Sequence, residues 1–271
     1  MVFVLFWYST ILKSWYFIRY ADPDNHLRVR VQINPNDATE VLKYFEKKIR
    51  HQVEKGSVNN LLLDTYKREI ERYGEHTIEY VEKVFQLSSE LVLAYLKKAS
   101  NGYSELHLAI ISVNSVLEIF FLQNSERITL LKGIHESMKH EFDDSKQVKF
   151  QLDNKYREYS FFINNMQANT KVISAITGKK EFNNYLKTLQ LLKLNAVHLT
   201  TEKLLKLVAD LIHMHLNRLF NEKQRKQEFI IYYLLYKYYI SIEARKCKMS
   251  LVLPPAPQCH RIDHVNEAVF K

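Results

Sequence analysis

Apolar residues recur with a helical period through most of this sequence, and that repeat constrains the fold more than any other feature. From about Thr77 onward they return every three to four residues, the spacing that places side chains on one face of an α-helix. Five glycines and five prolines in 271 residues leave few tight turns, which also favours a mostly helical chain. The pattern predicts helices near 77–99, 104–123, 126–143, 147–166, 181–193, 201–221 and 223–246, after an earlier helix from Ala38 to about Glu54.

The stretch before the first helix has strand character instead. Residues 15–31 read as two extended segments around residues 22–25, whose sequence Asp-Pro-Asp-Asn is typical of a turn. The apolar residues 1–12 are interpreted as an opening strand, and the short run Leu61–Tyr66 is also expected to be strand-like. The predicted fold class is therefore α+β, with a small antiparallel sheet near the N-terminus packed against a predominantly helical remainder.

The second extended segment carries three basic side chains on one face. It alternates polar and apolar residues, so His26, Arg28 and Arg30 point the same way. Two arginines on one strand face can receive a ligand with two carboxylates, because a guanidinium binds a carboxylate through two hydrogen bonds. The alternative is an exposed strand face whose arginines point into water, which is the more frequent case for an isolated pair.

The predicted helix 201–221 carries two histidines that are not equivalent. At 3.6 residues per turn, His215 falls on the apolar arc, whereas His213 falls opposite it, near Asp210 and Asn217. His215 is therefore expected in the core. His213 is either a solvent-exposed side chain or a group for proton transfer, with Asn217 one turn on able to fix its tautomer or hold a substrate amide. Asparagine is a poor zinc ligand, so this pair is not expected to bind a metal.

The stretch 66–75 leaves two conformations open. If it is helical, Glu69 and Arg72 lie one turn apart and can form an ion pair; if it is extended, they face opposite sides. A surface ion pair contributes only about 0–1 kcal/mol, so this pair alone indicates no function.

Composition narrows the class of protein. Thirty-nine Lys and Arg against 30 Asp and Glu give a net charge of +9, which suits nucleic acid, an anionic membrane surface or an acidic substrate. The basic residues are scattered and no nucleic-acid-binding motif appears, so direct nucleic-acid binding is not expected.

Cys247 and Cys259 form neither a metal nor a disulfide pattern, and no apolar run is long enough to span a membrane. We expect a cytoplasmic protein with no metal and no cofactor.

Three motifs together point to a family. In order, the sequence contains FIRYADPDNHLRVRV, YKREIERYGE and HMHLNRLF, with EKVFQLSSELVLAYL after the second. Over roughly residues 14–245 they resemble the C-terminal, glutamate-eliminating domain of lantibiotic dehydratases, which also occurs as free-standing thiopeptide-type bacteriocin biosynthesis proteins. The family commonly has a second glycine after Arg-Tyr, where this chain has Glu75. Nothing here resembles the glutamylation domain or its leader-peptide-binding module.

The resemblance implies a carbon–oxygen lyase. A partner uses glutamyl-tRNA to esterify Ser or Thr of a precursor peptide, and the elimination domain removes the glutamate to leave dehydroalanine or dehydrobutyrine. Matched motif by motif, the catalytic residues are His213, Arg72 and Glu69, and the glutamate carboxylates are bound by Arg28 and Arg30. From the same motifs, support is expected from His26, Asn217 and Arg218. His213 as the base is a hypothesis, because the sequence does not identify which residue takes the proton.

Partners and competing functions follow from the same resemblance. We expect a glutamylated precursor peptide as substrate and a separate tRNA-dependent glutamylating enzyme as partner, with a homodimer left open. The competing functions are a cyclase that joins two dehydroalanines in a formal 4+2 cycloaddition, as in pyridine synthases, and a non-catalytic partner subunit of a split dehydratase. The two strand arginines favour elimination over cyclisation.

A proline-containing tail ends the chain, so we expect one elimination-type domain over 1–248 and an extension over 249–271.

Overall fold

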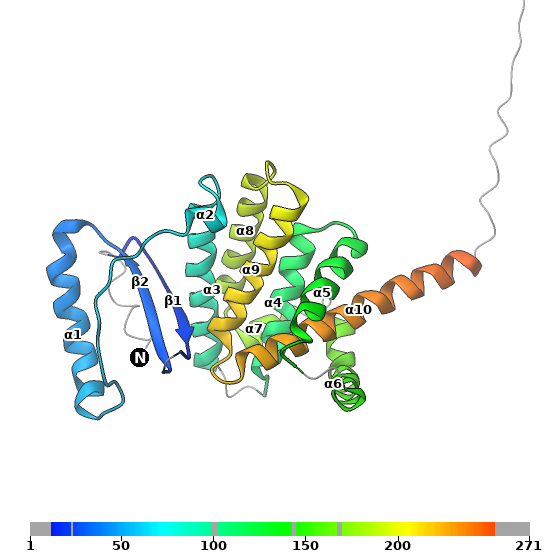
Figure 1. The fold of residues 1–271 in the computed structure, drawn as a ribbon, viewed down its shortest axis with the longest axis horizontal. Helices are drawn as coiled ribbons and strands as arrows, with labels where there is room; N and C mark the ends of the chain where they lie inside the picture. Colours follow the sequence, from blue (N-terminus) through cyan, green and yellow to red (C-terminus); the bar gives the residue numbers. More distant parts are fainter. Residues whose placement is uncertain (1–11, 23, 99–101, 143–144, 167–169, 253–271) are drawn as a thin grey trace, which may run out of the picture.

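A small sheet and a long helical region make up the fold, as the α+β prediction requires (Figure 1). The computed structural model describes residues 12–22, 24–98, 102–142, 145–166 and 170–252. Its elements are β1 (Ser14–Tyr20), β2 (His26–Gln32), a 3₁₀ turn (Pro35–Asp37), α1 (Ala38–Glu54), α2 (Ile70–Tyr73), α3 (Ile78–Lys98), α4 (Glu105–Phe120), α5 (Asn124–Met138), α6 (Lys146–Asn165), α7 (Thr170–Ile176), α8 (Lys179–Asn195), α9 (Thr201–Leu219) and α10 (Gln224–Val252). Within the described residues, no helix is both long and apolar enough to cross a membrane.

The two strands form the predicted hairpin. β1 and β2 pair antiparallel, and the register sets Tyr16 opposite Arg30 and Ile18 opposite Arg28. Directly opposed residues share a face of the sheet, so both arginines lie on the face that carries the side chain of Tyr16. Of the turn, Pro23 lies outside the described residues, as does the expected opening strand up to residue 11.

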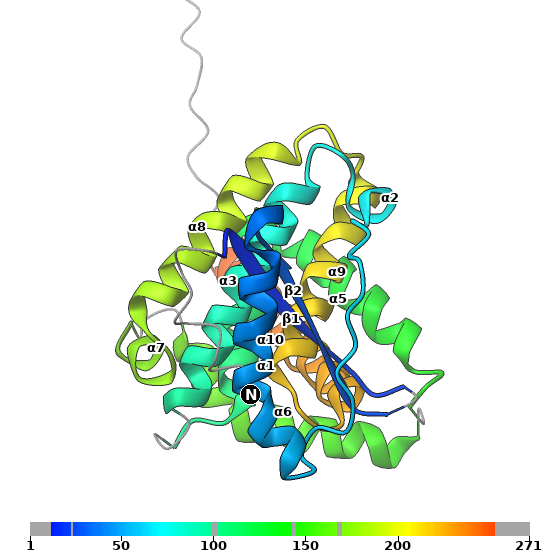
Figure 2. The same ribbon diagram turned by 90° about the vertical axis from the view of Figure 1, so that its left-hand side faces the viewer.

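The sheet lies between one helix and the helical bundle. In Figure 1, α1, β2, β1 and α3 follow one another from left to right, and Figure 2 shows α1 in front of both strands. The apolar side chains of β1 are buried against α3 and α9, and Phe17 is completely enclosed. This packing holds the hairpin against α9, the helix with the two histidines.

The helices pack around a central apolar helix. Nearly every side chain of α4 from Leu108 to Leu117 is buried, as expected of a helix that is apolar on all sides. It contacts α8, α9 and α10, while α10 packs along α5 and α6. The predicted helices after Thr77 are all present, because each pairs its apolar stripe with a neighbour.

The backbone differs from the prediction in three places. The run Leu61–Tyr66 is not a strand: residues 58–69 have no regular secondary structure, and Leu62 is 86% exposed, because no neighbouring strand pairs with this segment in the described chain. The short helix α7 was not expected. Helix α10 continues past its expected end at 246 to Val252.

Candidate active site

Helix α9 separates its two histidines as its periodicity predicts. His215 is 1% exposed and lies between two buried hydroxyls, with its Nδ1 2.8 Å from the Ser88 Oγ and its Nε2 2.8 Å from the Ser112 Oγ. Burial, with a smaller contribution from the charge of Arg218, lowers the pKa of His215 to about 3. It is a neutral core residue. The side chain of His213 on the opposite face is 34% exposed.

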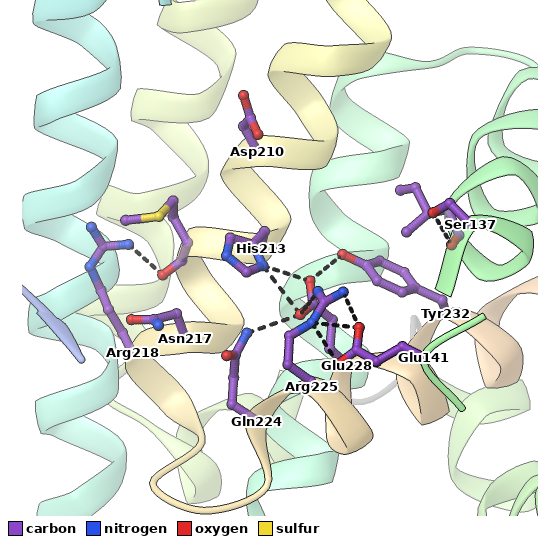
Figure 3. A network of polar contacts seen from close by, with 12 residues as sticks. Ser137, Glu141, Asp210, His213, Asn217, Arg218, Gln224, Arg225, Glu228 and Tyr232 are labelled. Atoms are coloured by element: carbon purple, nitrogen blue, oxygen red, sulfur yellow. Dashed lines mark hydrogen bonds and ion pairs between the residues drawn. The ribbon is translucent and has the colours of Figure 1, made fainter. Parts of the chain in front are cut away.

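The partner of His213 is a carboxylate on α10. The Nδ1 of His213 lies 3.0 Å from Oε1 and 3.2 Å from Oε2 of Glu228, whose side chain is only 2% exposed (Figure 3). Asn217 does not hold the imidazole: its amide nitrogen donates to the Arg19 carbonyl at 2.8 Å, and its amide oxygen accepts from the Arg19 N–H at 2.9 Å. Asn217 therefore fastens α9 to the end of β1.

A bidentate ion pair brings Arg72 to the same helix. Its Nε and Nη2 donate to the two carboxylate oxygens of Asp210 at 2.9 and 2.6 Å, and its Nη1 donates to Glu69 at 3.3 Å. The hydrogen bonds that Arg72 donates to Asp210 are the main reason that the pKa of Arg72 is raised. Within the stretch 66–75 only Ile70–Tyr73 is helical, with Glu69 at the N-cap, and the Glu69–Arg72 ion pair expected for a helix is present.

The carboxylate that binds Arg72 lies one turn from the histidine on α9. Asp210 and His213 are three residues apart on α9, and side chains at that spacing are neighbours, roughly 5–6 Å apart at Cβ. Three of the predicted residues, Glu69, Arg72 and His213, therefore gather around one face of α9.

The two strand arginines stack on aromatic rings. The guanidinium of Arg30 lies 4.9 Å from the ring centroid of Tyr66, and its buried Nε has no hydrogen-bond partner among the described residues. Arg28 is exposed, lies 4.0 Å from the ring centroid of Tyr20 and donates from its Nε to the His26 Nε2 at 3.3 Å. His26 in turn stacks on Tyr20. The rings hold both cations on the sheet face without neutralising them.

One short segment joins the hairpin to α9. Tyr66 contacts Arg30 at one end, and Arg72, six residues later, contacts Asp210 at the other. Among the described residues, the side chains of Arg28 and Arg30 contact Tyr20, His26 and Tyr66, whereas His213 contacts Glu228, so the structure shows no direct contact between the arginines and the histidine.

Arg218 is a buried cation rather than a ligand-facing one. It is completely enclosed, its Nη1 donates to the Met214 carbonyl at 2.6 Å, and its guanidinium lies 4.5 Å from the Phe85 ring centroid. Its Nε and Nη2 have no hydrogen-bond partner among the described residues. Burial lowers its pKa to about 10, which still leaves it charged at neutral pH. Its guanidinium lies between Phe85 of α3 and Tyr16 of β1, 4.5 and 5.7 Å from the two ring centroids.

Two acidic residues of the site were not assigned a role from the sequence. Asp210 was recognised only as lying near His213, and Glu228 was not singled out. Glu228 lies in a helix rich in charged and tyrosine residues, where nothing local separates it from surface carboxylates. Its burial against four donors becomes visible only when α9 and α10 are packed together. Among the described residues, no group of three His, Cys, Asp or Glu side chains is arranged to hold a metal ion.

Comparisons with known proteins agree with the motifs. Relatives include the nisin biosynthesis protein NisB of Lactococcus lactis subsp. lactis, 24% identical over 239 residues (85% of this chain and 22% of NisB), and the subtilin biosynthesis protein SpaB of Bacillus subtilis, 26% identical over 235 residues (80% of this chain and 21% of SpaB). The crystal structure of the tRNA-dependent lantibiotic dehydratase MibB from Microbispora sp. 107891 matches with a TM-score of 0.68 at 16% identity, covering 87% of this chain and 25% of MibB.

The match to a described family extends over most of the sequence. The chain spans only about a fifth to a quarter of the length of these relatives, so their activities as whole proteins do not transfer with the likeness. The profile described as lantibiotic biosynthesis dehydratase C-term, however, matches residues 6–239. The chain therefore belongs to the family of lantibiotic dehydratase C-terminal domains.

Proposed function

We propose that this protein removes glutamate from glutamylated Ser or Thr residues of a precursor peptide and leaves dehydroalanine or dehydrobutyrine. The observation that carries the proposal is the arrangement on one face of α9, where Asp210 holds Arg72 in a bidentate pair one turn from the part-exposed imidazole of His213. A proton acceptor and a fixed cation side by side are what β-elimination next to a carbonyl requires.

In the proposed reaction, His213 takes the α-proton of the esterified residue. The electrons of the Cα–H bond form the Cα–Cβ double bond, the Cβ–O bond breaks, and the pair in that bond leaves with the glutamate carboxylate. Arg72 stabilises the negative charge that develops on the adjacent peptide carbonyl, and Glu69 orients its guanidinium. Imidazole suits this task because its usual pKa lies near neutrality.

Arg28 and Arg30 receive the leaving group. Glutamate departs with two carboxylates, and the two guanidiniums lie on one face of β2, each resting on an aromatic ring. The buried Nε of Arg30 has no hydrogen-bond partner among the described residues, so its charge is not already committed to a carboxylate there. We propose a separate tRNA-dependent glutamylating enzyme as the source of the ester, consistent with the tRNA dependence stated for MibB.

The proposal is tested with a synthetic peptide that carries one glutamyl-serine ester. Incubation with the protein should convert it to the dehydroalanine peptide, read by mass spectrometry as loss of one glutamic acid, while the peptide without protein keeps its ester. A thiol added afterwards should form an adduct with the product only. An intact ester, or hydrolysis back to serine, would contradict the proposal. A peptide with two dehydroalanines that emerges cyclised and without its leader would favour the cyclase instead.

A further inference from the structure

Glu228 is the most enclosed carboxylate next to the proposed active site. Oε1 lies 2.8 Å from the Tyr232 hydroxyl and 3.0 Å from the His213 Nδ1. Oε2 lies 2.9 Å from the Gln224 Nε2, 3.1 Å from the Arg225 Nη1 and 3.2 Å from the His213 Nδ1. Arg225 is braced in turn by Glu141 at 2.7 Å (Figure 3).

These contacts define the donor at His213. A carboxylate has no proton to give, so the hydrogen bond between Glu228 and the Nδ1 requires a proton on that nitrogen. A neutral imidazole has only one such proton, and the Nε2 is then left with the lone pair. Since the Nδ1 is hydrogen-bonded to Glu228, the Nε2 is the nitrogen that can accept a proton from a substrate.

We propose that Glu228 is a positioning residue: it holds His213 in the Nδ1–H tautomer, so that the Nε2 is the atom that accepts the substrate proton. The role in elimination rests on the proposed function, whereas the tautomer does not. After proton transfer the imidazolium lies against the Glu228 carboxylate, which stabilises the charge as it forms. Glu228 itself is too enclosed and too fully hydrogen-bonded to reach a substrate.

An isosteric amide at this position should reverse the tautomer. In Glu228→Gln, the side of the amide that faces Arg225 and Gln224 must carry the oxygen, because Arg225 can only donate. The NH₂ group then occupies the position of Oε1, which is the oxygen nearer to the His213 Nδ1, at 3.0 Å against 3.2 Å for Oε2. There it can donate to Tyr232, whose hydroxyl also accepts, and to the Nδ1 of His213. An Nδ1 that accepts leaves the proton on the Nε2, the nitrogen that should take the substrate proton.

The experiment measures the imidazole directly. The full chain labelled with ¹⁵N-histidine gives nitrogen shifts that distinguish the two tautomers, and the His213 signals among the 11 histidines are assigned by their loss in His213→Gln. We expect Nδ1–H in the wild-type protein and Nε2–H in Glu228→Gln. Glu141→Gln is the matched control, since it removes a carboxylate from the same Arg225 without touching His213 and should leave the tautomer unchanged. Elimination should fall about 100-fold or more in Glu228→Gln, with little change in Glu141→Gln.

The outcomes separate this inference from the proposed function. Nε2–H in the wild-type protein, or an unchanged tautomer in a folded Glu228→Gln, would overturn the positioning role even if the protein eliminates glutamate. Failure of the wild-type protein to eliminate would remove the proposed function and leave the tautomer assignment standing. Should Glu228→Gln not fold, the wild-type tautomer and its persistence in Tyr232→Phe, which removes only the neighbouring hydroxyl, still test the proposal.

Discussion

His213 and His215 are two residues apart on α9, yet the protein treats them in opposite ways. His215 lies in the core between two serine hydroxyls and stays neutral, whereas His213 meets a buried carboxylate with one nitrogen and leaves the other near the surface. The difference arises from helix geometry: each residue of an α-helix is rotated by about 100° from the one before, so two residues two positions apart point to nearly opposite sides. It teaches that one face of α9 stabilises the fold and the other is free for chemistry.

The largest expected effect comes from removing the exposed-face imidazole. His213→Ala should slow glutamate elimination by about 10²–10⁴-fold, because the proton acceptor is lost. Folding should change little, since the ring is part-exposed. The rate is measured by mass spectrometry on the glutamylated peptide. His51→Ala on the exposed side of α1 is the control and should keep wild-type activity; equal rates in both variants would break the comparison between the two histidines.

Removing the buried imidazole should lower stability and leave the rate of elimination unchanged, the opposite of what is expected for His213→Ala. His215→Ala leaves a cavity and strips the hydroxyls of Ser88 and Ser112 of a partner, so the free energy of unfolding should fall by about 2–4 kcal/mol. Urea unfolding followed by circular dichroism measures that change. Elimination per folded molecule should stay near wild type. A large loss of turnover with an unchanged unfolding midpoint would show that the core histidine takes part in the chemistry.

Local patterns predicted much of this molecule. The hairpin register, the helices after Thr77 and the separation of the two histidines follow from side-chain periods of two and 3.6 residues, which a sequence displays directly. The strand expected at Leu61–Tyr66 was predicted wrongly because an apolar run does not say whether a partner strand exists. The four-residue helix α2 was left open because so short a segment has no measurable period.

The polar contacts of the site lay beyond local patterns. The Arg72–Asp210 pair joins residues 138 positions apart, and Asn217 binds Arg19 across 198. Such pairs depend on how α9 docks against β1 and α2, and a charged residue looks the same in a sequence whichever partner it finds. Glu228 is the clearest case, since its burial is a property of the α9–α10 packing.

The strand arginines should give an intermediate effect. Arg30→Ala removes one charge-assisted contact to the glutamate, worth about 1.5–3 kcal/mol, so kcat/KM for the glutamylated peptide should fall roughly 10–150-fold. Arg50→Ala is matched in charge, and Arg50 pairs only with the exposed Glu46 among the described residues, so this variant should be neutral. If Arg30→Ala behaves like Arg50→Ala, the hairpin is a solvent-facing strand and the leaving group is bound elsewhere.

The smallest expected effect is the part of the pH dependence of stability that His215 contributes. Burial lowers its pKa from 6.5 to about 3, so between these values the unfolded chain binds a proton that the folded protein does not. Its contribution to the free energy of unfolding is therefore complete above pH 6.5 and falls as the pH drops, by about 1.4 kcal/mol per unit, until the folded pKa is reached.

Comparison with His215→Ala isolates this term, because the other titrating groups, including His107, whose pKa is also lowered by burial, are shared by both proteins. Urea titrations between pH 7 and pH 5 should show the wild-type protein losing more of its stability than the variant. Parallel slopes would mean that the imidazole of His215 takes up a proton inside the fold, and the assignment of His215 to a neutral core face of α9 would then fail.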